Sequence, residues 1–469
     1  MLHELFLRLY QPFLHFSWRR SAWLTTIFNL LSFFIRKLTI MRRRSPSFPD
    51  LPVEVLMEIF QFATYLQESE SILPLDPFIP QQISHNALGP NTDLSTTRTK
   101  CALVLVCRSW RNVAIPLLYR NLVIRSPRKA TLLLSALESS YQTPPGTTTP
   151  SRSPLPSDHG RFARHLEIFT HSRGSNSYNF LMTICRVVQR CPNLRILSGS
   201  WNHALPSGFR QSISQMCKSN VREMFWSESD PDSYKLAEFM NSFQNLRVLD
   251  ISRMTAMHNE SALISLPSVQ DLIMSIHAES VSLATSMSVP KLHTLVIRLD
   301  NQKLYPEYSK HMKSFLQTHA TAIRTLHLLP PPGPNDQTPL QDFHTLFEDC
   351  ACLETVTFHV NSTPDFHHPS VRRVGVRGLS SEAFDSKTNN GSTCLKTLAD
   401  RLCYPCLETV RTVEYLVENH ITSQDHYIWW CEQFERRGVD FQDGAGIVWL
   451  YSETQDVQDT GGTPSNEKS

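Results

Sequence analysis

The chain is poor in glycine, with 15 glycines against 30 prolines in 469 residues. It contains neither a Walker nor a Rossmann glycine loop, the loops that cradle phosphate groups. The Gly-x-Ser-x-Gly and His-Glu-x-x-His sequences of hydrolases and metalloproteases are also missing. We therefore expect a protein that is not an enzyme and needs no cofactor, built from short elements joined by rigid connections.

Charge of one sign is also lacking, since the net formal charge is only +2. Basic residues are spread along the chain without interleaved aromatic residues, so we expect no nucleic-acid partner. A content of 41% hydrophobic and 19% charged residues is typical of a globular protein. A chain of 469 residues exceeds one typical core, which predicts a small module beside a larger domain.

The eleven cysteines follow no repeated spacing, which argues against a disulfide framework. Cys403 and Cys406 form a Cys-x-x-Cys pair, and Cys350 and Cys352 are the nearest second pair. A structural zinc ion needs four ligands, and the spacing of the second pair is poor for this purpose. We expect buried apolar cysteines here and no metal site.

The N-terminal extension, residues 1–41, contains an apolar run at 21–35 that is too short to cross a bilayer, which takes about twenty residues. No small-x-small cleavage site follows this run. It could serve as an interfacial anchor, or the true start could be Met41, with the extension a mis-annotated or dispensable segment. We expect a cytoplasmic or nuclear protein, with membrane association as the alternative.

Residues Phe48–Leu66 show the spacing of an amphipathic helix. Asp50 is a suitable N-cap residue, and Pro52 fits the first turn, where its missing N–H donor does no harm. The apolar positions are Val55, Leu56, Ile59, Phe60 and Ala63.

A second helical arm is predicted over Thr99–Ile124. One side of this helix carries Leu103, Val106, Cys107, Trp110, Val113 and Ala114. Between the two arms lies a polar insert, 67–98, which has four prolines up to residue 97 and little periodicity. We expect the insert to be a surface loop that is disordered or loosely packed.

The residues Leu51-Pro52 and, on the second arm, Cys107-Arg108-Ser109-Trp110 give this part of the chain its resemblance to a known family. It resembles an F-box, in the form expanded in mushroom-forming (basidiomycete) fungi. The resemblance implies an F-box-like domain at 45–125 that binds the Skp adaptor and, through it, the cullin of a ubiquitin ligase. A helix-in-groove contact of this kind uses aliphatic anchors. The expected adaptor contacts are Leu51, Pro52, Val55, Leu56, Ile59, Val106, Cys107 and Trp110.

From residue 161 onward one unit recurs ten times: an apolar residue, two others, then an apolar–x–apolar strand. Successive units are 18 to 36 residues apart, which brackets the 20–29 residue period of leucine-rich repeats. The alternative is an ordinary α/β domain with coincidental matches. The units lie near Leu166, Leu194, Val221, Leu246, Val269, Leu292, Ile323, Leu353, Val371 and Leu407.

Stacked strands of this kind form a parallel sheet with helices on its back, supplied by stretches such as 179–189 and 233–243. A helix and a Thr/Pro/Ser-rich linker fill 126–160, the repeat domain spans 161–451, and 452–469 is a disordered tail. We expect a C-terminal cap with a helix at 427–434 and a closing strand pair at 439–449. Its tryptophans, Trp429, Trp430 and Trp449, are expected in the core.

The predicted fold class is therefore α/β, with a helical F-box hairpin followed by an irregular leucine-rich-repeat-like solenoid. The resemblance implies that the protein is the substrate-recognition subunit of a Skp–cullin–F-box ligase, with an unidentified protein substrate bound by the repeats. The alternative is a repeat scaffold outside any ligase, which residues 21–35 could hold at a membrane.

Overall fold

The computed structural model describes residues 51–66, 70–74, 76–78, 92–141, 158–170, 177–229, 233–254, 263–299, 306–329, 350–360, 368–385, 390–419 and 424–450. The chain divides into two compact units. The helical unit has residues up to Glu70 plus Gln81–Asn121, and the repeat unit has Ser71–Pro80 plus Leu122 onward. The N-terminal extension, Asp50 and the tail at 452–469 lie outside the described residues. Within the described ranges, every helix is too short or too polar to cross a membrane.

The helical unit contains α3 (Val53–Ala63), α5 (Asp93–Val106) and α6 (Arg108–Arg120). Helix α3 begins directly after Pro52, whose carbonyl accepts the N–H of Leu56 at 3.1 Å. Helix α5 begins with a capping box. The Thr92 hydroxyl accepts the Ser95 N–H, and the Ser95 hydroxyl accepts the Thr92 N–H.

The predicted second arm, a single helix from Thr99, is wrong in two respects. The helix breaks at Cys107, which is extended (φ −160°) and separates α5 from α6. The Cys107 carbonyl accepts the Arg111 N–H at 2.9 Å and so opens a new helix. The predicted insert also ends too late, because the capping box starts α5 at Asp93.

The core of the helical unit lies between the three helices. It is formed by Phe60, Val113, Ala114 and Leu117, and the partly buried Leu56, Met57, Leu103, Val104 and Trp110 pack against it. Phe60 is the largest of these buried side chains, and its ring meets that of Trp110 edge-on at 4.9 Å. An aromatic pair of this geometry contributes about 0.5–1.5 kcal/mol beyond its buried area.

The repeat unit is built on a twelve-stranded sheet, and every pair whose register is described is parallel. In sheet order the strands are β1 (Asn121–Ile124), β2 (His165–Thr170), β3 (Ile196–Trp201), β4 (Glu223–Glu228), β5 (Val248–Asp250), β7 (Asp271–Ser275), β9 (Thr294–Arg298), β10 (Thr325–Leu329), β11 (Thr355–His359), β12 (Arg373–Arg377), β13 (Thr409–Thr412) and β14 (Asp440–Gln442). The strands from β2 to β13 coincide with the ten predicted units. The leucine-rich-repeat-like solenoid is therefore confirmed.

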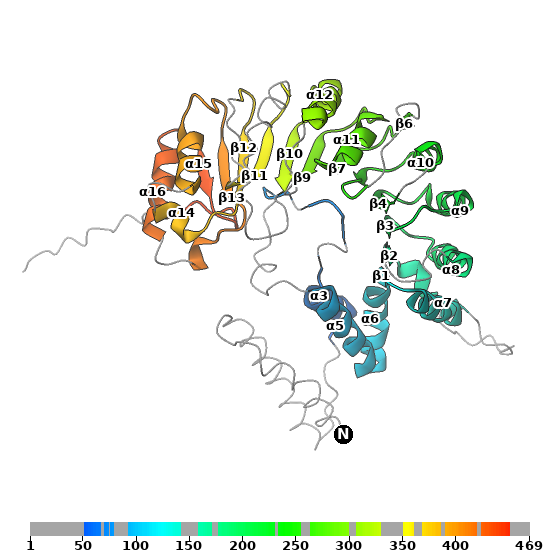
Figure 1. Cartoon of the computed structure of the whole chain (residues 1–469). Coiled ribbons are helices and arrows are strands. Elements are labelled where there is room, and N and C mark those ends of the chain that lie inside the picture. The colour runs from blue at the N-terminus through cyan, green and yellow to red at the C-terminus, as the bar shows by residue number, and fades with distance from the viewer. Residues whose placement is uncertain are drawn as a thin grey trace, which may run out of the picture. The chain divides into compact units, whose positions relative to one another are not determined.

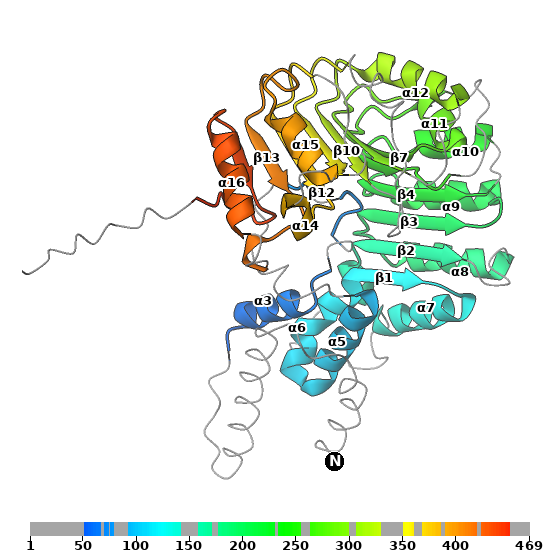
Figure 2. The same cartoon turned by 60° about the vertical axis from the view of Figure 1, so that its left-hand side comes forward.

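Within the repeat unit the strands line the inner side of an arc, and most of the helices lie along the outer side (Figure 1). Figure 2 shows β1–β4 stacked in order with α7–α9 beside them. The helices are α7 (Pro127–Tyr141), α8 (Tyr178–Gln189), α9 (Ser207–Cys217), α10 (Ser233–Asn241), α11 (Ala278–Thr285), α12 (Pro306–His319), α14 (Ser381–Asp385), α15 (Asn390–Ala399) and α16 (Gln424–Glu435), with 3-10 turns η3 (His159–Phe162) and η5 (Val417–Asn419). A second sheet pairs β6 (Ile264–Ser265) with β8 (Met287–Ser288). The predicted helices at 179–189 and 233–243 correspond to α8 and α10.

Aromatic packing fills the space between the first strands and their helices. Trp226 of β4 lies 6.2 Å from Trp201 of β3 and 4.7 Å from Phe239 of α10, measured between ring centroids. Gly199 lies beneath this cluster, and a Cβ there would come within 2.9 Å of the Trp226 ring. Glycine therefore lets the two tryptophans approach the β3 backbone.

The C-terminal cap contains α16 and β14, which pairs with β13. The predicted closing strand pair reduces to β14 and one antiparallel bridge between Gln442 and Val448. Trp430 is buried as predicted, but Trp429 is exposed and Trp449 is half-buried. The adjacent residues Trp429 and Trp430 project from different sides of α16, so only one of them can face the core.

The expectation of buried cysteines before the late strands holds for only one of the four cysteines. Cys350 is buried, whereas Cys352 and Cys406 are exposed and Cys403 is intermediate. Among the described residues no three His, Cys, Asp or Glu side chains gather as a metal site would require.

Candidate partner-binding surfaces

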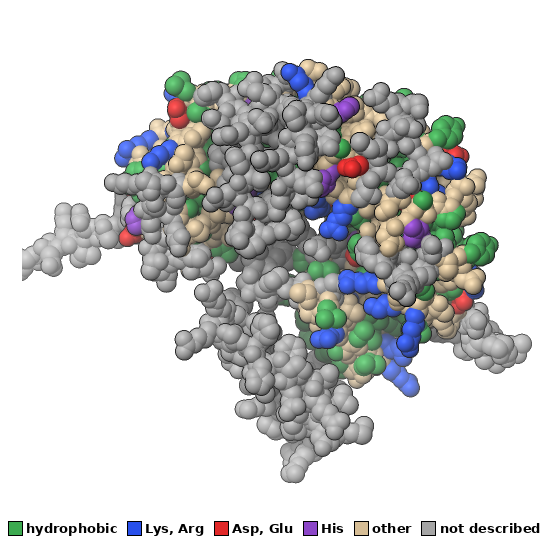
Figure 3. All heavy atoms as spheres, in the orientation of Figure 1, with side chains coloured by type: hydrophobic (Ala, Val, Ile, Leu, Met, Phe, Trp, Pro, Cys, Tyr) green, Lys and Arg blue, Asp and Glu red, His purple; other side chains and the backbone are tan. Residues whose placement is uncertain are grey.

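The outward face of α3 is an apolar surface on the helical unit. Val55, Ile59 and Phe62 lie at i, i+4 and i+7, so they share one side of the helix. All three are exposed, as are Leu51 and Val53 at the start of the helix. Hydrophobic side chains are visible at the surface of this unit beside Lys and Arg (Figure 3). We call these five residues the α3 stripe.

The predicted adaptor contacts of the first arm fall into two groups. Leu51, Val55 and Ile59 belong to the α3 stripe, and Pro52 is exposed at the N-cap. Leu56 lies beside the stripe, on the part of α3 that packs against the core of the helical unit. Four of the five residues are therefore accessible, and Leu56 is mainly structural.

The predicted contacts of the second arm are also divided. Val106 at the end of α5 is 58% exposed, and Cys107 is exposed in the break between the helices. The Cys107 thiol lies 3.1 Å from the Ser109 hydroxyl, a contact that lowers the pKa of Cys107. Trp110 packs against Phe60 in the core. Val106 and Cys107 are accessible, whereas Trp110 holds α6 against α3.

The second surface is the inner face of the repeat sheet. Side chains alternate along each strand, and those at one register position, such as Leu249, Leu272 and Leu295, point into the core between sheet and helices. Their neighbours in each strand point to the inner side of the arc. The inner face carries a separate apolar cluster of Val248, Ile273 and Val296, on three adjacent strands.

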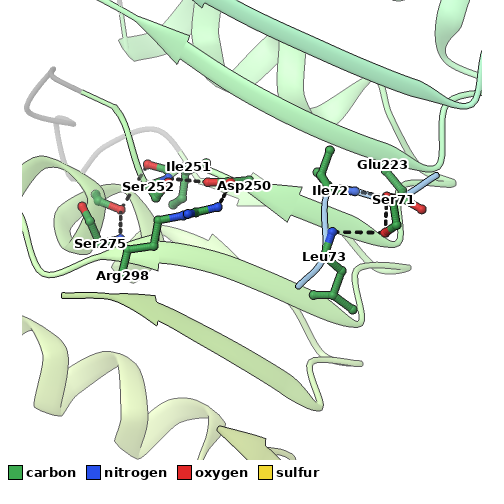
Figure 4. A network of polar contacts seen from close by, with 10 residues as sticks. Ser71, Ile72, Leu73, Glu223, Asp250, Ile251, Ser252, Ser275 and Arg298 are labelled. Atoms are coloured by element: carbon green, nitrogen blue, oxygen red, sulfur yellow. Dashed lines mark hydrogen bonds and ion pairs between the residues drawn. The ribbon is translucent and has the colours of Figure 1, made fainter. Parts of the chain in front are cut away.

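Residues 71–74 and 76–78 of the predicted insert lie on this inner face, and we call this stretch the 71–78 segment. At its start, the carboxylate of Glu223 in β4 accepts the Ser71 hydroxyl at 2.8 Å and the Ile72 N–H at 2.9 Å. The Leu73 N–H is donated to the Ser71 hydroxyl, as Figure 4 shows. The Glu223 carboxylate thus holds the start of the segment on the inner face through two hydrogen bonds.

Next along the segment, Ile72 and Leu73 pack against the apolar cluster of β5, β7 and β9, together with Leu329 of β10. Ile273 and Val296 have no exposed surface although they point to the inner side of the sheet. On an uncovered sheet these side chains would face water. The two aliphatic residues therefore close this part of the inner face.

The end of the segment lies among arginines of the late strands. The Phe78 ring has the Arg373 guanidinium at 5.2 Å and the Arg411 guanidinium at 5.5 Å from its centroid. Arg411 also donates from Nη1 to the Pro77 carbonyl at 2.7 Å and from Nε to Gln442 at 3.0 Å. Two cations on one aromatic ring make a cation–π contact of about 0.5–2 kcal/mol each, depending on burial.

Burial changes the acidity of the groups that meet the segment. It raises the pKa of Glu223, and the hydrogen bonds from Ile72 and Ser71 act against that rise. Burial lowers the pKa of His327 on β10 to about 4, while the Asp76 carboxylate acts in the opposite direction. Burial also lowers the pKa of Arg411. The inner face therefore holds ionisable groups that have lost most of their water.

The prediction of a loosely packed insert is wrong for residues 71–74 and 76–78. The sequence there is SILPLDPF, and its apolar residues Ile72, Leu73 and Phe78 are not typical of a solvated loop. This apolar content was the available signal. Strand or helix periodicity could not reveal it, because residues 71–74 and 76–78 form neither element.

Basic residues that are scattered in the sequence also come together in the repeat unit. The positions directly before β3, β4 and β5 are Arg195, Arg222 and Arg247, and all three are exposed. Each backbone N–H is donated to the carbonyl of the equivalent residue in the preceding repeat, so the arginines form a row along one edge of the sheet. The sequence contains them at repeat intervals, which was the signal for such a row.

A scan of the chain against models of protein families finds no match. A search of curated proteins also finds no match. Among solved structures, the chain is similar to one in the crystal structure of the Rad7 and Elc1 complex in yeast, with 11% identity and a TM-score of 0.30. The similarity covers 84% of this chain and 94% of that chain. A likeness at this identity and TM-score says nothing of what this chain binds.

Proposed function

We propose that this protein is a non-catalytic adaptor: the substrate-recognition subunit of a Skp–cullin–F-box ubiquitin ligase. The helical unit would bind the Skp adaptor, the repeat unit would bind a protein substrate, and other subunits would transfer ubiquitin. The observation that carries the proposal is the α3 stripe, five exposed apolar residues on or next to one helix.

The stripe supports the proposal because it combines two properties. Exposed apolar residues gathered on one helix mark an interaction site more often than scattered ones do. The stripe also includes Leu51, which together with Pro52 forms the Leu-Pro pair on which the resemblance to an F-box partly rests. An amphipathic helix of this kind docks through residues spaced i, i+4 and i+7, as Val55, Ile59 and Phe62 are.

The test is co-purification of the full chain with a Skp adaptor from a basidiomycete, comparing wild type with Ile59→Asp. Ile59 is half-exposed and is not part of the core cluster, so the variant should fold. Loss of a central anchor costs about 2 kcal/mol or more, which is at least roughly 30-fold in affinity. Leu56→Asp is less informative, because Leu56 packs against the core and a charge there would disrupt the fold.

Leu132→Asp is the matched control, since Leu132 is an exposed leucine on α7 of the repeat unit. Binding by wild type and Leu132→Asp, with loss in Ile59→Asp, supports the adaptor role. If wild type fails to bind although it is folded, the ligase proposal is wrong. The protein would then be better described as a repeat scaffold outside any ligase.

A further inference from the structure

Part of the inner face of the repeat sheet is covered by a stretch of the chain that does not belong to the repeats. The 71–78 segment lies in sequence between α3 and α5, two helices of the helical unit, yet it belongs to the repeat unit. Its contacts run from Glu223 on β4 to Arg411 on β13. A short piece of insert therefore meets strands from most of the solenoid.

The segment is bound to the sheet without being part of it. Its described residues form no strand, and the N–H of Ile72 is donated to a side chain, the Glu223 carboxylate. The sheet's own ladder pairs β4 with β5, β7, β9 and onward without it. Removing the segment would leave the backbone hydrogen bonds of the strands intact, as expected of a ligand rather than a structural strand.

The side chains beneath the segment would lose hydrogen bonds or become exposed to water if nothing covered them. Without it the Glu223 carboxylate loses two donors and the Arg411 guanidinium loses the Pro77 carbonyl. Ile273 and Val296, both fully buried, would face water. Buried polar groups left without partners and apolar surface returned to water both cost free energy, so another chain with the same groups would be favoured there.

We propose that the 71–78 segment is an intramolecular ligand of the inner face, and that this site binds an extended peptide of the same chemistry from a protein partner. The partner segment would carry a branched aliphatic pair and, a few residues later, an acidic residue, a proline and an aromatic. This inference rests on the proposed function, because it specifies the substrate class that the repeat unit would recognise.

Three features of this ligand correspond to side-chain contacts of the segment. The aliphatic pair fills the place of Ile72 and Leu73 over the cluster of β5, β7 and β9. The acidic residue replaces Asp76, whose charge acts on His327 and whose carboxylate accepts the Phe78 N–H at 2.9 Å. The aromatic ring replaces Phe78 between Arg373 and Arg411.

The tethered copy must be displaced before a partner binds. A segment joined to the site by a short chain acts at an effective concentration of about millimolar. If the free peptide binds the open site at about 10 μM, the closed protein would bind it roughly 100-fold more weakly, since only the open fraction is competent. The segment thus sets a threshold that a partner must exceed.

The experiment measures binding of a fluorescein-labelled peptide, SILPLDPF, to the full chain by fluorescence anisotropy. The open variant has residues 71–78 replaced by glycine and serine of equal length, and a peptide with aspartate in place of its Ile-Leu pair is the control ligand. We expect the open variant to bind SILPLDPF at least 10-fold more tightly than wild type does. We also expect the open variant to bind the control ligand at least 10-fold more weakly than it binds SILPLDPF. Equal binding to wild type and open variant, or no binding to a folded open variant, would overturn the proposal.

If the open variant fails to fold, Leu73→Asp in the otherwise intact chain replaces it, since this change leaves the sheet untouched. Hydrogen exchange of wild type adds a readout that needs no variant. The Ile72 amide, held by Glu223, should exchange slowly and should speed up when excess SILPLDPF is added; an unchanged rate would contradict displacement. Skp adaptor takes no part in these measurements, so their failure is distinguishable from failure of the adaptor proposal.

Discussion

Two apolar surfaces of this protein have similar chemistry and different environments. The α3 stripe, with Leu51, Val55 and Ile59, is exposed to solvent. The inner-face cluster of Val248, Ile273 and Val296 is covered by Ile72 and Leu73 of the same chain. The comparison shows that apolar residues of similar size are exposed on α3 and are covered by residues of the same chain on the inner face of the repeat sheet.

The largest expected effect is a difference in stability between variants on the buried side and on the exposed side of α3. Phe60→Ala should destabilise the helical unit by about 3–5 kcal/mol, because the buried ring fills the core and meets Trp110. Phe62→Ala is the matched control, since Phe62 lies in the exposed stripe, and its cost should stay within about 1 kcal/mol. Hydrogen exchange of the α3 and α6 amides measures both. Similar losses in the two variants would show that the stripe is also packed.

The next effect is a pH dependence of the stability of the repeat unit, caused by His327 on the inner face. Burial lowers the pKa of His327 to about 4, against about 6.5 in an unfolded chain. Between these values the unfolded state binds more protons, so stability falls as pH drops through this window. The full loss below pH 4 is roughly 3 kcal/mol. Urea unfolding of the repeat unit at pH 7 and pH 4.5 measures it, and His327→Gln should flatten this part of the pH profile.

A carboxylate of the 71–78 segment modifies that titration. Asp76 raises the pKa of His327 against the effect of burial. Asp76→Asn should therefore lower the pKa of His327 further, as read from the imidazole signals in NMR spectra. An unchanged pKa would mean that the segment does not lie over β10 in solution, which would break the contrast between the covered and the open surface.

A smaller effect tests the contact between segment and sheet directly. Leu73→Ala and Ile273→Val should each destabilise the repeat unit, and a double-mutant cycle should show a coupling of about 0.5–1 kcal/mol, because the two side chains share one cluster. Leu73 combined with Ile168→Val is the control pair, since Ile168 is a buried residue of β2 that is not in this cluster. Additive losses in both pairs would argue against the contact.

The smallest effect is expected on the open surface. Val55→Ser should change the stability of the isolated protein by no more than about 0.5 kcal/mol, because Val55 is exposed and outside the core. Thermal unfolding without the Skp adaptor measures it. A loss above 1 kcal/mol would indicate that another part of the chain covers the stripe.

The sequence predicted the repeat strands well because each unit repeats one local pattern. Leu166, Leu197 and Met224 open the core-facing positions of three successive strands, and all are fully buried. The apolar spacing of α3 likewise predicted the helix, although it placed Val55, Leu56, Ile59 and Phe60 together and could not tell which of them faced the core. Leu56 and Ile59 are equally apolar, and only the position of α6 decides that Leu56 faces inward.

Other features depended on contacts that local patterns do not contain. The sequence around the break at Cys107 contains neither glycine nor proline, the residues that usually indicate the end of a helix. The N–H of Ile72 is bound to Glu223, 151 residues later, and the carbonyl of Pro77 to Arg411, 334 residues later. Periodicity reports how a residue relates to its neighbours within a turn or a strand. The sequence by itself therefore determined the solenoid and the amphipathic arm. Only the tertiary structure decided that residues 71–74 and 76–78 cover part of the inner face, because those contacts join residues far apart in the chain.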